Sequence, residues 1–188
     1  YAARIFESKI LSNRILSIAF DGASSVQFPH EYPAPRMVTN SLRLETLLYG
    51  TLTHTFHRRR LYTSPPAFTH DINYVLTVLA FEIVSSLQSN PHFDPTTLYL
   101  QADNCVSQNK NQYLFAFIAV LLFNGWFTDV HFNFLSVGHT HDDVDAIFGL
   151  FASQRHHTCT SAPTLPNLIE GVTSSPTAKF SASEFVAI

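Results

Sequence analysis

Three acidic residues stand at or just beyond the ends of apolar runs. Asp21 and Asp103 each directly follow a short apolar run, and Asp145 lies a few residues beyond a third. Carboxylates brought together from distant segments stay ionised only when a cation lies between them. Mg²⁺ suits such a site, because a few carboxylates, waters and phosphate oxygens satisfy it. The pattern predicts a Mg²⁺ or Mn²⁺ site for phosphoryl transfer, with two ions about 4 Å apart that activate a water or a 3′-hydroxyl.

Each acid also has an ordinary structural interpretation. Asp21 begins a common Asp-Gly turn pair, and Asp103 suits the cap of a turn before the next helix. Asp142 suits the N-cap of the following helix and Asp143 its first turn, where the helix dipole favours an acid. Asp145 is the better third metal ligand, because it lies further into that helix. The three acids together are stronger evidence than any one of them.

Two histidines precede the third acid. His139 and His141 are open to three interpretations: metal ligands, a general acid and base beside a phosphate, or turn residues. We assign His139 a catalytic role beside the acids and His141 a role as a metal ligand. A different hypothesis is a mononuclear iron oxygenase that uses His141-Asp142-Asp143. That site requires a distant third histidine on a β-barrel strand, and the helical content of the sequence argues against it.

Polar and basic side chains offer contacts to a phosphate. The amides of Asn104 and Asn109 and the ammonium of Lys110 could hold a phosphate or orient Asp103, although a solvated loop explains them equally well. A second group is a basic cluster that could contact a nucleic-acid backbone, made of Arg58, Arg59 and Arg60. A cluster of three such residues is more often an ordinary exposed face.

The elements that position these residues follow from the spacing of apolar residues. Strands are predicted at 14–20, twice within 42–56 with a kink near Gly50, at 97–102 and at 130–137. Helices are predicted at 69–87 with Thr69 as the cap, at 111–126 as a buried helix, at 142–153 and near 165–172.

This order predicts an α/β fold with a ribonuclease-H-like mixed sheet: three antiparallel strands, then two parallel strands, flanked by helices. Another α/β sheet is also compatible with it. If the first and fourth strands are neighbours, Asp21 and Asp103 lie side by side where parallel strands end. We expect residues 1–158 to form the catalytic core and 159–188 a C-terminal extension, in a piece of a longer protein.

Composition narrows the class of protein. The chain has 188 residues, 46% hydrophobic and 13% charged, which fits one folded domain rather than a disordered chain. Its net charge of −3 argues against strong DNA affinity in this segment alone, so we expect another domain to help bind DNA. Two cysteines fit a reducing compartment. The longest apolar run, 113–123, is shorter than the ~20 residues that span a bilayer, so no membrane is expected.

Two long motifs carry a family resemblance. Residues 98–111 (LYLQADNCVSQNKN) and 134–145 (FLSVGHTHDDVD) resemble the signature of an uncharacterised transposon-associated domain family of eukaryotic genomes. Its members resemble DDE/D-type transposase cores with a ribonuclease-H-like fold, and the likeness covers roughly residues 14–153. The resemblance implies the triad Asp21, Asp103 and Asp145 with His139 beside it, and action on DNA in the nucleus.

We therefore expect a transposase-like core that cleaves or joins DNA phosphodiesters with Mg²⁺ or Mn²⁺, with a homo-oligomer as one possible assembly. The alternative is a catalytically inactive binding or assembly module. It would account for the low positive charge and for the 17 phenylalanines, if some of them lie on the surface.

Overall fold

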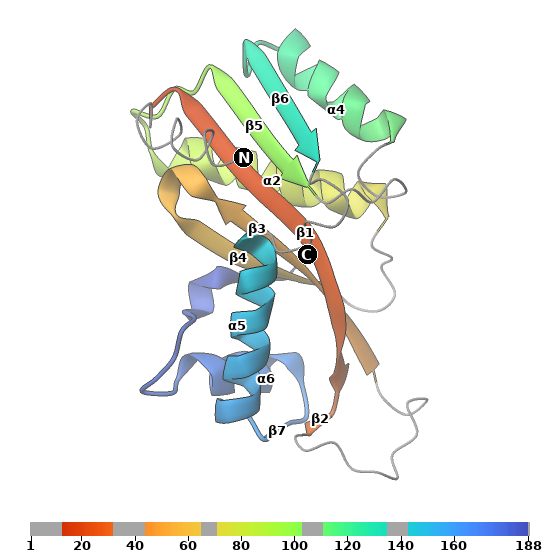
Figure 1. Cartoon of the computed structure of the whole chain (residues 1–188), viewed down its shortest axis with the longest axis vertical. Coiled ribbons are helices and arrows are strands. Elements are labelled where there is room, and N and C mark those ends of the chain that lie inside the picture. The colour runs from red at the N-terminus through yellow and green to blue at the C-terminus, as the bar shows by residue number, and fades with distance from the viewer. Residues whose placement is uncertain (1–12, 32–43, 65–70, 103–110, 135–142, 188) are drawn as a thin grey trace. The chain divides into compact units, whose positions relative to one another are not determined.

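The computed structural model in Figure 1 describes residues 13–31, 44–64, 71–102, 111–134 and 143–187. Its strands are β1 (Ile15–Phe28), β2 (His30–Glu31), β3 (Leu44–Thr53), β4 (Arg58–Ser64), β5 (Thr97–Ala102), β6 (Asp129–Phe134), β7 (Ser161–Ala162) and β8 (Phe185–Ala187). Its helices are α2 (Ile72–Ser89), α4 (Gln112–Phe123), α5 (Asp143–Thr158) and α6 (Leu165–Thr173), with the 3₁₀ turns η2 (His54–Phe56) and η3 (Ala182–Glu184).

The main sheet has six strands in the order β6-β5-β1-β3-β4-β8, and β2 pairs with β7 in a separate antiparallel ribbon. Strand β5 pairs in parallel with β1 on one side and with β6 on the other. Strands β3 and β4 are neighbours joined only by η2 and His57, so they run antiparallel. The predicted mixed α/β sheet flanked by helices is confirmed. The first and fourth predicted strands are parallel neighbours, which is the condition on which the adjacency of Asp21 and Asp103 depended.

Two strand predictions were wrong in detail. Strand β1 continues through Asp21 and Gly22 to Phe28, so no turn follows Phe20. The two strands predicted within 42–56 are one strand, β3, which runs through Gly50. The third strand of the sheet is β4, which begins at Arg58. The chain reverses instead at η2 and His57, whose φ of 50° is left-handed. Pairing with neighbouring strands therefore overrides the local turn tendency of Asp-Gly and the flexibility of Gly50.

The chain divides into two compact units, and β1, β3 and β4 contribute residues to both. The first unit comprises 1–21, 51–58 and 69–142, and the second comprises 22–50, 59–68 and 143–188. The boundary predicted after residue 158 coincides with the end of α5, inside the second unit. That domain division stays a prediction.

In the first unit, α2 supplies much of the core. It begins at Asp71, whose side chain accepts a hydrogen bond from the Tyr74 amide at 3.1 Å, so the predicted cap at Thr69 was wrong. Its buried apolar residues recur at helical spacing: Val75, Val78, Leu79 and Ile83. By length and composition α2 could also cross a membrane, but a buried core helix meets the same criteria.

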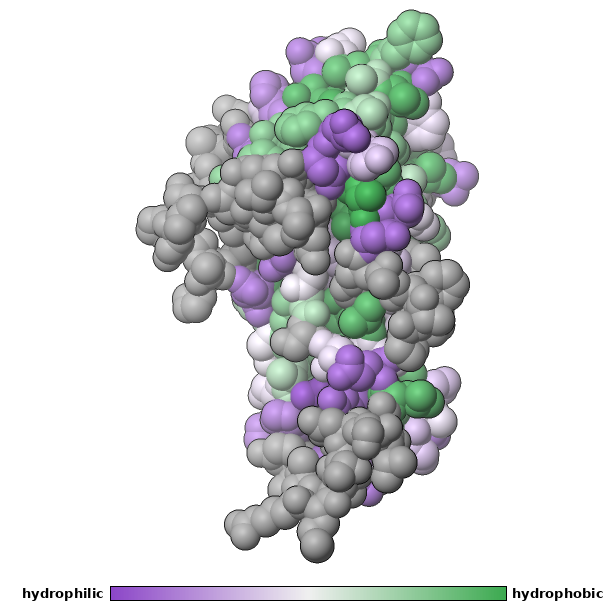
Figure 2. Space-filling model, turned by 90° about the vertical axis from the view of Figure 1, so that its right-hand side faces the viewer, coloured by the Kyte–Doolittle hydropathy of each residue, from purple (hydrophilic) through white to green (hydrophobic). Residues whose placement is uncertain are grey.

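Helix α4 was predicted to be buried, and this prediction was wrong. Only Leu114 and Leu121 are buried along it, whereas Phe123 is 91% exposed and Tyr113 is 57% exposed. The helix packs on β6, the outermost strand of the sheet, through an edge-to-face contact between Phe115 and Phe132. One side of α4 therefore meets the sheet. Hydrophobic side chains gather at the top of the view in Figure 2, where α4 lies.

In the second unit, α5 packs closely on β3. A Cβ atom added at Gly50 would lie 2.7 Å from the Phe148 ring and 2.9 Å from a methyl of Val144. Gly50 is thus needed for the close approach of the helix to the strand. The apolar residues that α5 buries are Val144, Ile147 and Phe151.

Candidate functional site

The last described pairs of the parallel strands β1, β5 and β6 form one row, and β1 itself continues beyond it to Phe28. Phe20 of β1 is the register partner of Ala102 in β5, and Ala102 is the partner of Phe134 in β6. Asp21 directly follows Phe20, and Asp103 directly follows Ala102 in the sequence. The carboxyl ends of parallel strands are where α/β sheets place their sites. Phe20, Ala102 and Phe134 are therefore neighbours across the sheet. They directly precede Asp21, Asp103 and the segment 135–142.

Asp21 belongs to the polar face of these strands. Successive side chains of a strand project to opposite faces, so Asp21 shares a face with Ser17 and Ala19, while Phe20 projects to the other. Ala19 pairs with Gln101, and Gln101 pairs with Asn133, which places two amides in the row before the strand ends. The opposite face is apolar, and there the Phe20 and Phe132 rings stack with centroids 6.2 Å apart.

Further polar groups line the same face. The Tyr99 and His131 rings meet edge to face at 4.8 Å between centroids, and Ser17 Oγ lies 3.3 Å from His54 Nδ1. The sequence alone did not single out Gln101, Asn133 or His131. The alternation of side chains along β5 and β6 places these residues on one face of each strand. Only the register of the two strands shows that they lie beside one another.

The remaining predicted site residues divide into two groups. Asp145 lies in the first turn of α5, in the second unit, and is partly exposed. Six others lie outside the described residues: Asp103, Asn104, Asn109, Lys110, His139 and His141. Within the described ranges no three His, Cys, Asp or Glu side chains gather at metal-binding distance. Since two of the four predicted ligands, Asp103 and His141, lie outside those ranges, the metal site stays a prediction.

The predicted basic cluster lies in β4. The Arg58 guanidinium pairs with Glu82 of α2 at 3.1 Å and donates to Ser86 Oγ at 2.6 Å. Arg59 pairs with Glu184 and lies 4.5 Å from the centre of the Phe180 ring. Two of the three guanidinium groups are thus engaged with carboxylates of this chain. Contact of Arg58, Arg59 and Arg60 with a nucleic-acid backbone stays a prediction.

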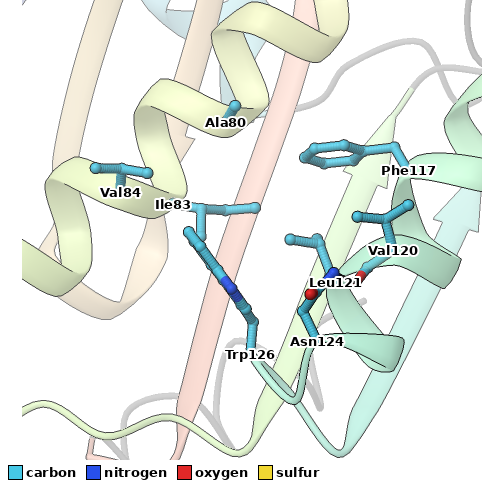
Figure 3. Close-up of a pocket in the computed structure, with 8 residues that line it drawn as sticks. All are labelled: Ala80, Ile83, Val84, Phe117, Val120, Leu121, Asn124 and Trp126. Atoms are coloured by element: carbon cyan, nitrogen blue, oxygen red, sulfur yellow. Dashed lines mark hydrogen bonds between the residues drawn. The ribbon is translucent and has the colours of Figure 1, made fainter.

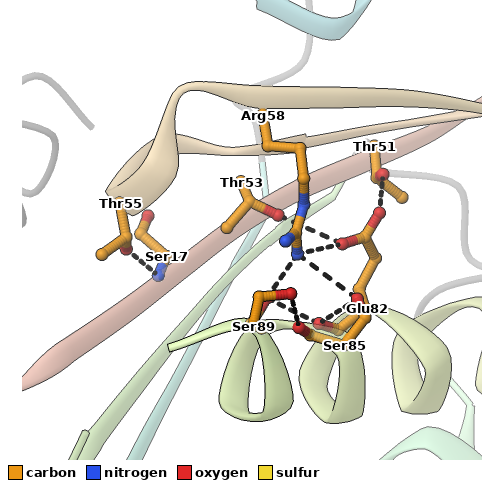
Figure 4. Close-up of polar contacts among 9 residues, drawn as sticks. Ser17, Thr51, Thr53, Thr55, Arg58, Glu82, Ser85 and Ser89 are labelled. Atoms are coloured by element: carbon orange, nitrogen blue, oxygen red, sulfur yellow. Dashed lines mark hydrogen bonds and ion pairs between the residues drawn. The ribbon is translucent and has the colours of Figure 1, made fainter. Parts of the chain in front are cut away.

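Glu82 is a fully buried acid that the sequence did not single out (Figure 4). Its Oε1 accepts a hydrogen bond from the Thr51 hydroxyl at 2.6 Å, and its Oε2 accepts one from Thr53 at 3.3 Å besides the ion pair with Arg58. A buried carboxylate with several donors is satisfied in place. We therefore interpret Glu82 as the anchor of α2 on the β3–β4 hairpin and not as a catalytic acid.

A pocket of about 370 Å³ lies between α2 and α4 in the first unit. Figure 3 shows Ile83 of α2 and Phe117 and Leu121 of α4 projecting toward it, with Trp126 at one end. Among the described residues that line it, the polar side chains are the Asn124 amide and the Trp126 indole, neither of which is a catalytic acid, base or nucleophile. This lining suits apolar groups.

The parallel pairs of the sheet exclude the iron-oxygenase alternative. That hypothesis placed its third histidine on a strand of an antiparallel β-barrel of the jelly-roll kind, whereas β1, β5 and β6 run parallel. No curated protein matches the chain. A family model described as a domain of unknown function, DUF7869, matches residues 36–188, which include Asp103 and Asp145 but not Asp21, and the chain belongs to this family.

Proposed function

We propose that the chain is a ribonuclease-H-like, metal-dependent core that cleaves or joins DNA phosphodiesters. The observation that carries this proposal is the row of register partners Phe20, Ala102 and Phe134, the last described pairs of the three parallel strands. Asp21, inside the longer strand β1, and Asp103 are the next residues after two of these positions. A fold that aligns two such positions brings two carboxylates to one edge, where a hard divalent cation offsets their repulsion.

The strand order supports the ribonuclease-H-like layout. Strands β3 and β4 lie on one side of β1, while the parallel strands β5 and β6 lie on the other. In the sequence, helix α2 leads from β4 to β5 and helix α4 from β5 to β6. This is the predicted succession of three strands followed by two parallel strands with crossover helices.

The residue types fit Mg²⁺ or Mn²⁺. The polar face near the strand ends offers carboxylate and amide oxygens, which are the hard donors these ions accept. Asp21 and Asp103 would hold the metal, and Asp145 and His141 stay the further ligands that the sequence predicts. When bound, the ions would supply Lewis acidity and a nucleophile at neutral pH. His139 would position a water or a phosphate.

Contacts with DNA belong mainly to the segment after β5 in this proposal. Arg58 and Arg59 are engaged with Glu82 and Glu184, which reduces their value for phosphate binding. The amides of Asn104 and Asn109 and the ammonium of Lys110 are the remaining candidates. With a net charge of −3, the chain would require a further domain or a second copy for strong DNA affinity. The proposed site of action is the nucleus.

The second candidate function is a non-catalytic binding or assembly module. The exposed aromatic side chains of α4 favour it, because large exposed apolar patches usually mark interaction surfaces. This candidate requires no metal. Metal binding therefore separates the two functions.

Calorimetric titration of the folded chain with Mn²⁺ and Mg²⁺ tests the proposal. We expect micromolar-to-millimolar binding that is lost in Asp21→Asn and Asp103→Asn. The matched control is Asp129→Asn, an exposed aspartate at the opposite end of β6, which should bind like the wild type. Failure of the folded wild type to bind either ion would overturn the metal site, and so would equal loss in the control. DNA cleavage is then assayed with the same three variants.

A further inference from the structure

A second pocket lies within the second unit, between α5 and the strands β1 and β3, with a volume of about 300 Å³. Its walls include Leu48, Phe148 and Phe151, and its polar side chains are those of Ser25 and Arg155. The lining includes none of the three predicted acids. An inference about this pocket is therefore independent of the proposed metal site.

Arg155 has no carboxylate partner among the described residues. Its Nε is buried and donates no hydrogen bond within that part of the chain, and its Nη2 lies 3.4 Å from His156 Nε2. Arg58 and Arg59, by contrast, each pair with a glutamate. Arg155 is half-buried, and this partial burial lowers its pKa.

No acidic side chain lines the pocket beside Arg155 in the part of the chain that the structure describes. His156 and His157 follow Arg155 in the last turn of α5, and burial first, and then the charges of Arg155 and His157, lower the pKa of His156. The Arg155 cation in a lining without carboxylates therefore favours an anionic ligand. The Arg155 guanidinium is planar, and its unpaired Nε–H is one edge of the fork that holds phosphates and carboxylates.

The walls favour a flat apolar group beside that anion. The rings of Phe148 and Phe151 line the pocket, and the Arg155 guanidinium lies 5.9 Å from the centre of the Phe151 ring. A Cβ atom added at Gly149 meets nothing within 4 Å, so this glycine leaves open space in the wall. Aromatic rings offer a stacking surface to planar groups such as nucleobases.

We propose that this pocket binds a nucleotide, whose phosphate pairs with the Arg155 guanidinium and receives a hydrogen bond from the Ser25 hydroxyl. The base lies against Phe148 and Phe151. The volume of about 300 Å³ suits one small organic phosphate and not a large cofactor. The nucleotide is either free or one unit of a nucleic-acid strand, and both share this chemistry.

The test is calorimetric titration of the whole chain with thymidine 5′-monophosphate, in EDTA so that no divalent ion contributes. We expect binding that weakens at least about tenfold in Arg155→Met, since hydrogen bonds to a charged group contribute that much affinity. Gly149→Leu, which fills the open space, should weaken binding similarly. Arg14→Met, which removes an exposed arginine of the first unit, is the matched control and should bind like the wild type.

Thymidine and inorganic phosphate, titrated separately, should each bind at least about tenfold more weakly, because each lacks one half of the interaction. Equal binding of thymidine, unchanged binding in Arg155→Met, or no binding of the monophosphate by the folded wild type would overturn the proposal. If Arg155→Met fails to fold, Gly149→Leu alone decides. Competition by a short oligothymidylate assigns the site to a strand, and lack of competition assigns it to the free nucleotide.

Discussion

Removal of the cation that faces buried Glu82 should strongly destabilise the first unit. The Glu82 side chain is 1% exposed, and the Arg58 side chain beside it is 21% exposed. Arg58→Met keeps the length and apolar stem of the side chain but leaves the carboxylate without its counter-charge. A buried charge that loses its partner costs more than the pair contributed, because the carboxylate cannot regain its hydration in place.

The magnitude follows from what remains around the carboxylate. Loss of one partner of a buried pair costs about 3–5 kcal/mol. The hydroxyls of Thr51 and Thr53 still donate to Glu82, which places Arg58→Met at the lower end, about 3 kcal/mol. In a chain of this size, that loss lowers the melting temperature by about 6–12 °C. Glu82→Gln should cost less, about 1–2 kcal/mol, because Arg58 reaches solvent.

Urea unfolding monitored by circular dichroism measures these differences, with Arg14→Met as the control for loss of an exposed arginine. The double variant Arg58→Met, Glu82→Leu should recover most of the stability, since an apolar pair replaces the ion pair. A folded Arg58→Met variant within about 0.5 kcal/mol of wild type would refute the reasoning, as would additive losses in the double variant.

Four further predictions concern other parts of the chain. Gly50→Ala should destabilise by about 1–3 kcal/mol in urea unfolding, because its Cβ meets the Phe148 ring, whereas Gly149→Ala should be neutral or stabilising. Asn111→Ala should cost about 1 kcal/mol and Asn111→Gly only a few tenths, because the side chain caps two amides of α4. The pKa of His156 is lower in the folded chain than in the unfolded chain, so the unfolded chain binds a proton at His156 first and stability falls as pH drops below about 6.5. His156→Gln should therefore lose less melting temperature than the wild type between pH 7.5 and pH 5.5. Phe123→Ser should change stability by less than about 0.5 kcal/mol but reduce binding of a hydrophobic dye, because the ring is 91% exposed.

The sequence predicted the parallel core well. Both ends of the strand at 97–102 were predicted correctly, because a proline precedes this short apolar run and a polar stretch follows it. That β1 and β5 are neighbours was only a condition of the sequence argument, and the structure supplies it. The register was not predictable in this way. It decides that Phe20 and Ala102 are partners, and hence that Asp21 and Asp103 follow adjacent positions.

The prediction that α4 is buried failed for a different reason. An apolar run indicates that a segment avoids water, but it does not indicate how much of the segment the rest of the chain covers. Helix α4 packs on the outermost strand β6, and the pocket beside it is bordered by α2. The position of a helix over the edge of a sheet depends on contacts between distant segments, which apolar periodicity does not contain.

The arginines illustrate the same limit for charge. Three adjacent arginines in the sequence suggest one basic patch, yet successive side chains of a strand project to opposite faces. In β4, Arg58 reaches Glu82, which is 24 residues away, while Arg59 reaches Glu184, which is 125 residues away. Arg155 stands alone in the sequence, but it lines a pocket without a carboxylate partner among the described residues. The charge available to an anionic ligand is therefore set by the partners that the fold supplies, and on this basis Arg155 is the stronger candidate for a phosphate contact.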